Sequence, residues 1–244
     1  MEIIQSVVSA APVKKEASHE SELHTQLLYH QKALDTGERI GSWTKISFEE
    51  DDAHYFILSS QIEKVVAEQE TYYLLPSDQR ILLFNKPTML FAGSVLTKKE
   101  YTIATSSFSF SREFIHSFLQ AYIGVPYLWG GLTTAGIDCS GISKLLYTFA
   151  NMQLPHSASK QMKAGITVDF IQQVQAGDLA FFMNADQEIN HVGILLSPHE
   201  IVHASVGNGV VAIDDFDQEG IIFRSNGKRG HPLRMIKRLI SALA

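Results

Sequence analysis

The sequence predicts an α+β fold in which small β-barrels precede a domain built from a helix pair and an antiparallel sheet. Short apolar runs separated by turn residues fill the first 108 of the 244 residues. Helical spacing of apolar residues begins at about residue 109, and strand-like runs return after Pro155. Helices that come before strands in this way are typical of α+β domains, because the two kinds of element form separate layers.

Residues 1–62 are predicted to form a small β-barrel. Their apolar runs have strand length and are separated by polar or glycine-containing turns such as Asp35-Thr36-Gly37, a spacing typical of barrels. Residues 63–108 repeat the pattern and predict a second, more divergent β module. The expected strands are IIQSVVSA, LHTQLLYH, KALDTGERI, SWTKISF and HYFIL, followed by YYLLP, RILLFN, MLFAGSVL and YTIATS.

Residues 109–244 are predicted to form the α+β domain. A first helix is expected between a cap at Ser111 and a stop at Gly124. A second helix should follow Cys139, because the next apolar residues fall on one helical face; they are Ile142, Leu145, Leu146 and Phe149. Strands are expected at 178–184, 191–196, 200–206 and 209–213.

Cys139 is the only cysteine of the chain and is predicted to be a nucleophile. A glycine-containing loop precedes it, and Asp138 is a good helix N-cap residue. Backbone N–H groups at a helix start favour thiolate over thiol, so we expect a lowered pKa for Cys139. The alternative is a small, buried, unreactive side chain.

His191 and His203 are the candidate partners of this thiol, since a nucleophile needs a base and the base needs an orienting group. If residues 197–199 form the hairpin loop, Leu196 pairs with Glu200 and His203 faces Gly193. His191 is then the diagonal neighbour of His203 on the same face. A slip by one residue would separate the two side chains, and each histidine would then be structural.

Six motifs follow one another in the third domain, between about residues 109 and 215: PYLWGG, DCSG, LPHSASKQ, GDLAFF, HVGIL and IVHA. In this order they resemble the catalytic domain of the NlpC family of bacterial cell-wall cysteine peptidases. The resemblance implies a papain-like fold with Cys139 as nucleophile, His191 as general base and His203 as its orienting residue. It also implies that the Tyr127 hydroxyl helps to stabilise the oxyanion.

The N-terminal part contains the segments SELHTQ, GSWTKI and HYFIL. These segments resemble the bacterial SH3-like domain found in γ-D-glutamyl-L-diamino-acid endopeptidases. It implies that a free N-terminal ammonium group of the substrate is held by acidic and polar side chains. The candidates are Asp138 and Ser140 beside the cysteine, and Glu22 and Tyr55 from the first domain.

One motif departs from the family pattern. Where the family has Leu-Pro-Arg followed by a hydroxyl residue, this chain has Leu154-Pro155-His156-Ser157. His156 cannot supply the permanent, two-pronged charge of an arginine, so the role of that arginine is in doubt here. Ser157 is kept as a further candidate for substrate binding.

The resemblance predicts hydrolysis of the bond between γ-D-glutamate and a diamino acid in murein stem peptides with a free N-terminal L-alanine. Two alternatives stay open. One is an amidase or acyltransferase of the same superfamily, and the other is a non-catalytic wall-binding protein built on SH3-like barrels. The Cys139, His191 and His203 set argues against the binding protein, because binding needs no nucleophile.

Composition sets further expectations. The net charge of −6 argues against a nucleic-acid or anionic membrane partner, and the longest apolar runs are too short to span a membrane. The start of the chain carries no basic leader, so a cytoplasmic protein is expected. A monomer is expected as well. We expect no cofactor and no metal; a zinc site from Cys139, the two histidines and Asp138 lacks a second cysteine or an H-E-x-x-H helix.

Overall fold

A computed structural model describes residues 1–65, 72–83, 86–97, 100 and 109–240, and divides the chain into two compact units. The first unit contains residues 1–108 together with 129–134, and the second contains residues 109–128 and 135–244. The two units are described separately below. The predicted boundary between two β modules at residue 62 stays a prediction.

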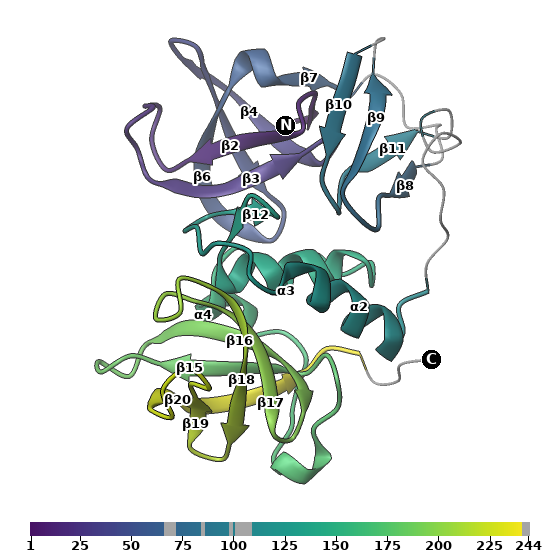
Figure 1. Cartoon of the computed structure of the whole chain (residues 1–244). Coiled ribbons are helices and arrows are strands. Elements are labelled where there is room, and N and C mark those ends of the chain that lie inside the picture. The colour runs from purple at the N-terminus through teal and green to yellow at the C-terminus, as the bar shows by residue number, and fades with distance from the viewer. Residues whose placement is uncertain (66–71, 84–85, 98–99, 101–108, 241–244) are drawn as a thin grey trace. The chain divides into compact units, whose positions relative to one another are not determined.

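The first unit contains a barrel-like antiparallel sheet of seven strands, in the order β3-β2-β6-β5-β4-β1-β7 (Figure 1). Its inward side chains form one apolar core that includes Val13, Leu27, Ile46 and Ile57. The run IIQSVVSA, expected as one strand, ends at Ser6, and a separate strand starts at Ala10. The strands are β1 (Glu2–Ser6), β2 (Ala10–Lys14), β3 (Leu23–Leu28), β4 (Lys32–Ile40), β5 (Trp43–Phe48), β6 (Asp51–Leu58) and β7 (Ile62–Lys64).

Two short strand pairs also lie in the first unit. They are β9 (Gln79–Leu83) with β10 (Lys86–Leu90), and β8 (Tyr72–Leu74) with β11 (Val95–Thr97). Their core includes Tyr29 from the N-terminal part of the chain. The strand expected at YTIATS falls on residues 101–106, outside the described residues. β12 (Leu132–Thr133) also belongs to this unit.

The second unit contains an antiparallel sheet of seven strands, in the order β14-β20-β15-β16-β17-β18-β19. A further pairing of β19 with β20 makes this sheet barrel-like. Three of these strands, β14, β19 and β20, were not predicted. The strands of this unit are β13 (Gly136–Ile137), β14 (Ile166–Thr167), β15 (Leu179–Met183), β16 (Ile189–Ser197), β17 (Glu200–Ser205), β18 (Val210–Asp217), β19 (Gly220–Ile222) and β20 (Arg229–Arg238).

Three helices lie on one side of this sheet (Figure 1): α2 (Arg112–Tyr122), α3 (Cys139–Thr148) and the short α4 (Ala158–Gln161). As predicted, the Ser111 hydroxyl caps α2 by accepting from the Phe114 amide, and Gly124 follows the helix with a left-handed backbone. Within the described residues, no helix has the length and apolar character needed to cross a membrane.

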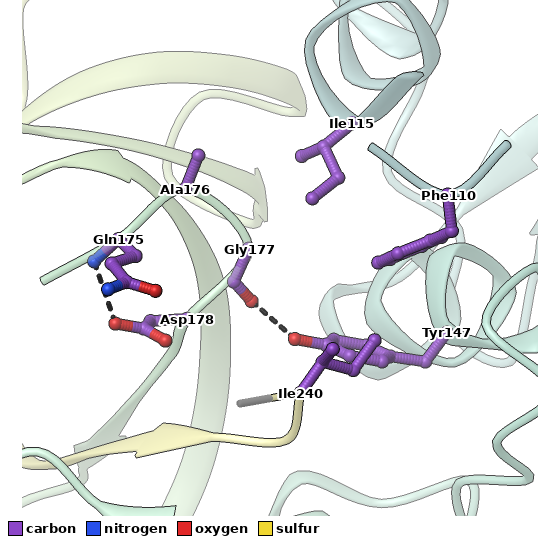
Figure 2. Close-up of a pocket in the computed structure, with 8 residues that line it drawn as sticks. All are labelled: Phe110, Ile115, Tyr147, Gln175, Ala176, Gly177, Asp178 and Ile240. Carbon is purple, nitrogen blue, oxygen red and sulfur yellow. Dashed lines mark hydrogen bonds between the residues drawn. The ribbon is translucent and has the colours of Figure 1, made fainter. Parts of the chain in front are cut away.

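The α3 helix is fixed to both of its neighbours. Phe149, directly after the helix, packs edge-on against Phe114 of α2. At the opposite side, the Tyr147 hydroxyl donates a 2.6 Å hydrogen bond to the Gly177 carbonyl just before β15, at a small pocket (Figure 2). Since α3 also packs on β16, the helix that begins with Cys139 is held against both the sheet and α2.

Candidate active site

Cys139 is the first residue of α3 and is buried, with 5% of its surface exposed. Asp138 caps the helix: its Oδ1 accepts from the Gly141 amide at 2.6 Å and from the Ser140 hydroxyl at 2.9 Å. A backbone hydrogen bond from Val192 on β16 reaches the cysteine sulfur. The thiol therefore lies beside the residue that follows His191.

The predicted lowering of the cysteine pKa is wrong for this structure. Burial, followed by the charge of the Asp138 carboxylate, raises the pKa of the Cys139 thiol to about 12. Backbone N–H groups of Val192, Ser140 and Cys139 itself favour the thiolate, but they offset only part of this rise. The helix start supplies the expected hydrogen bonds, and desolvation outweighs them. The free protein therefore holds a neutral thiol at neutral pH.

His191 on β16 and His203 on β17 lie on one face of the sheet, as the predicted register requires. The hairpin differs in detail: Ser197, not Leu196, pairs with Glu200, and a β-bulge between Leu195 and Ser197 takes up the extra residue. Beyond the bulge Ile194 pairs with Val202, so His203 faces Gly193. A β-carbon placed on Gly193 would lie 3.2 Å from that of His203.

The two histidines belong to a buried chain of hydrogen bonds that ends on a carboxylate. His191 Nε2 lies 2.8 Å from His203 Nδ1, and His203 Nε2 lies 2.9 Å from Asp214 Oδ2. The sequence analysis missed Asp214. It lies on β18, where Ala212 pairs with His203, so Asp214 is the diagonal neighbour of His203. Counting the register across one more hairpin would have found it.

A third histidine, His231, was also missed because β20 was not predicted. Its ring stacks on that of His191, with centroids 4.4 Å apart and planes 21° from parallel. Burial, then the charges of His203 and His231, lower the pKa of His191 well below its usual value. His191 is therefore neutral at pH 7, as a general base must be.

Tyr127 lies close to the cysteine in the second unit. It is half-buried and belongs to a short segment that bridges Ile137. Burial raises the pKa of its hydroxyl, and the negative charge that Cys139 carries when it is ionised, with that of Asp138, raises it further. The Tyr127 hydroxyl therefore stays protonated and is able to donate a hydrogen bond near the thiol.

The LPHS segment is held against the start of α3. The Ser140 hydroxyl also lies 3.1 Å from the His156 carbonyl, so its one hydrogen is shared between this oxygen and Asp138 Oδ1. Gln161, fully buried, donates from Nε2 to the carbonyls of Ser140 and Pro155, each at 2.9 Å. Ser157 caps α4 by accepting from the Lys160 amide. Its binding role stays a prediction.

Glu22 and Tyr55 lie in the first unit and have partners there. The Glu22 carboxylate accepts from Trp129 Nε1 at 2.6 Å and pairs with Lys15 at 2.8 Å. The Tyr55 hydroxyl donates to Asp51 Oδ2 at 2.7 Å, and its ring is buried. Their assignment as ligands of a substrate ammonium group stays a prediction.

Residues 124–227 match the NlpC/P60 family. The chain contains an NlpC/P60 domain. The matched range includes Cys139, His191 and His203 at the positions described above. No group of three or more histidine, cysteine, aspartate or glutamate side chains in the described ranges is arranged to hold a metal ion.

Relatives of the NlpC/P60 domain include named peptidases. The chain is 35% identical over 85 residues to the γ-D-glutamyl-L-lysine dipeptidyl-peptidase of Bacillus subtilis. The aligned residues make up 34% of this chain and 28% of that protein. It is 36% identical over 95 residues to the probable endopeptidase NlpC of Escherichia coli. These residues make up 38% of this chain and 61% of that protein. The chain thus matches less than two thirds of the length of these relatives.

The fold has a solved counterpart over nearly the whole chain. An NlpC/P60 family protein from Bacillus cereus superposes with a TM-score of 0.68 over 97% of this chain and 99% of that one, at 16% identity. At this identity the likeness concerns the fold alone. The naming of the N-terminal barrel-like sheet as an SH3-like domain stays a prediction.

Proposed function

We propose that the NlpC/P60 domain is a cysteine peptidase that hydrolyses an amide bond in bacterial cell-wall peptides. The observation that carries this proposal is the position of the Cys139 thiol at the start of α3, hydrogen-bonded from Val192 next to His191. We assign the nucleophile to Cys139, the neutral base to His191 and the orienting group to His203, all three of which are buried.

The reaction starts from the neutral pair of thiol and imidazole. Cys139 Sγ attacks the scissile carbonyl while its proton passes to His191. His191 then gives this proton to the leaving amine, and a thioester with Cys139 remains. His191 next takes a proton from water, whose oxygen attacks the thioester carbonyl. The acid is released and the thiol regains its proton.

The oxyanion of each tetrahedral intermediate needs hydrogen-bond donors. The Cys139 backbone N–H at the helix start and the Tyr127 hydroxyl are the proposed pair. The raised pKa of Tyr127 keeps its hydroxyl protonated throughout the pH range of the reaction. Tyr127→Phe is therefore expected to lower kcat by roughly 10²- to 10³-fold with little change in the fold.

The proposed substrates are murein stem peptides in which γ-D-glutamate is joined to a diamino acid and the N-terminal L-alanine is free. The names of the relatives support this bond. The buried Asp138 carboxylate, next to the nucleophile, is the proposed ligand of the free ammonium group, with Ser140 beside it. Cleavage in the cytoplasm, on released wall fragments, and a monomeric state stay predictions.

Mass spectrometry of products tests the proposal. The protein is incubated with L-Ala-γ-D-Glu-meso-diaminopimelate, with the lysine analogue and with the N-acetylated peptide. Release of L-Ala-γ-D-Glu from the free peptides is expected, and the acetylated peptide should react much more slowly. Equal cleavage of the blocked peptide would refute recognition of the ammonium group. Activity retained in Cys139→Ala would show that the nucleophile is misassigned.

A further inference from the structure

Asp214 is a buried carboxylate, 2% exposed, with a donor at each oxygen. Oδ1 accepts from the backbone amide of Arg224 at 2.8 Å. Oδ2 accepts from Asn208 Nδ2 at 2.9 Å and faces His203 Nε2 at 2.9 Å. Burial opposes ionisation, but these hydrogen bonds outweigh it and keep the pKa of Asp214 below its usual value. Asp214 is therefore a carboxylate with no proton to give.

The ionised carboxylate decides where the proton of His203 lies. Because Asp214 only accepts, the Nε2 atom of His203 must carry hydrogen. A neutral imidazole has one N–H, so His203 Nδ1 is then an acceptor. His191 Nε2, 2.8 Å away, must supply the hydrogen for that contact. His191 Nδ1 is left with its lone pair, which is the atom needed to accept a proton from a thiol.

We propose that Asp214 is a positioning residue that sets the tautomers of both histidines, so that His191 Nδ1 is the general base. Asp214 acts through His203 and touches neither the thiol nor the scissile bond. The inference deepens the proposed function and depends on it for its effect on turnover. The tautomers themselves can be measured without any substrate.

Asp214→Asn is the decisive variant, because it should reverse the chain of hydrogen bonds. The Arg224 amide is a backbone donor that cannot turn away, whereas the Asn208 side-chain amide can turn and present its oxygen, so the new amide oxygen stays at the Arg224 contact. The amide NH₂ then faces His203 Nε2, which must become an acceptor. His203 Nδ1–H would next donate to His191 Nε2. His191 Nδ1 would carry hydrogen and lose its function as a base.

Asp215→Asn is the matched control. Asp215 is the next residue on the same strand, faces solvent and pairs with the Arg224 side chain at 2.7 Å. The substitution is the same and the strand is the same, but the buried histidines are untouched. Asp214→Ala is a second variant: it removes the carboxylate without introducing a donor at His203.

Long-range ¹H–¹⁵N NMR spectra of histidine-labelled protein at pH 7.5 test the tautomers directly. In the wild type we expect an Nε2–H tautomer for both His203 and His191, and in Asp214→Asn an Nδ1–H tautomer for both. A wild-type His203 that is doubly protonated, or that carries its hydrogen on Nδ1, would overturn the proposal. This result holds whether or not Asp214→Asn folds.

Kinetics supply the second readout. Asp214→Asn should lower kcat by roughly 10²- to 10⁴-fold, with KM nearly unchanged. A loss on this scale is found when the carboxylate that orients a catalytic histidine is replaced by an amide, which leaves the histidine in the wrong tautomer. Asp214→Ala should lose less kcat, although it leaves a larger cavity; a purely structural role predicts the reverse order. If the wild type cleaves no peptide, the proposed function fails, while the NMR result still decides the tautomers.

Discussion

His191 Nε2 and His203 Nδ1 are 2.8 Å apart and both rings are buried, so these two nitrogen atoms share a single hydrogen between them. The contact joins two strands through a diagonal pair of side chains, and a second diagonal pair joins His203 to Asp214. His191, the proposed base, therefore gets its orientation from the sheet, while the Cys139 thiol gets its position from helix α3.

Alkylation of Cys139 tests the raised pKa of its thiol. At pH 7 iodoacetamide should react with the folded protein more than about tenfold more slowly than with the same protein unfolded in urea, because only the thiolate reacts. The rate should keep rising up to pH 10. Labelling is clean because the chain has one cysteine. A rate that reaches its plateau below pH 7 would contradict the prediction.

The pH profile of kcat/KM reports on His191 in the free protein. Since burial and neighbouring charges lower its pKa, the base stays neutral and activity should persist well below pH 6.5. His231→Ala should move this acid limb to higher pH, because it removes a neighbouring charge and admits water to the His191 ring. His199→Ala, on the exposed hairpin loop, is the control and should leave the limb in place.

Stability should fall in acid for the same reason. Folded His191 resists protonation, whereas the unfolded chain takes up a proton below about pH 6.5, so the free energy of unfolding decreases as the pH falls below this value. One such group contributes at most ~1.4 kcal/mol per pH unit. Urea denaturation at pH 7.5, 6.5 and 5.5 should show a steeper fall for the wild type than for His191→Gln; equal slopes would count against a depressed pKa.

Tyr147→Phe tests the attachment of α3 to the sheet. The change removes the hydroxyl that donates to the Gly177 carbonyl (Figure 2) and leaves the ring packing in place. We expect a loss of about 1 kcal/mol in stability and a fall of roughly 2–4 °C in Tm. The kcat should stay within about twofold, because Cys139 lies at the far end of the helix. A large loss of kcat at unchanged Tm would be inconsistent with a purely structural hydroxyl.

The parts of the site that sequence predicts are those set by local rules. A capping aspartate before an apolar helical face places Cys139 at the start of a helix, and a short hairpin fixes which side of the sheet His191 and His203 share. These relations span few residues and depend on backbone geometry alone. They hold in the structure even though the loop of the hairpin is one residue shorter than expected.

What the sequence analysis missed depends on burial and on distant strands. The pKa of Cys139 is decided by the desolvation of its sulfur, which no local pattern of residues reports. His231 comes from β20, whose mixture of proline, cations and apolar residues lacks a clean alternation, so the strand was not predicted. The pairing of β17 with β18 brings Asp214 to His203. Counting residues across the turn between these two strands, as was done to pair His203 with Gly193, would have predicted it.

The bulge between Leu195 and Ser197 has a consequence for how this hairpin tolerates change. The bulge lies next to the turn that connects the two strands. An insertion or deletion in this turn can therefore be absorbed at the bulge, and the side chains further along the strands stay on the same faces of the sheet. A residue added between His191 and Ile194 could not be absorbed in this way, and it would move the His191 side chain to the opposite face of the sheet. Length variation among natural or engineered versions of this hairpin is therefore expected at its tip, with the spacing from His191 to Leu195 and from Ile201 to His203 held constant.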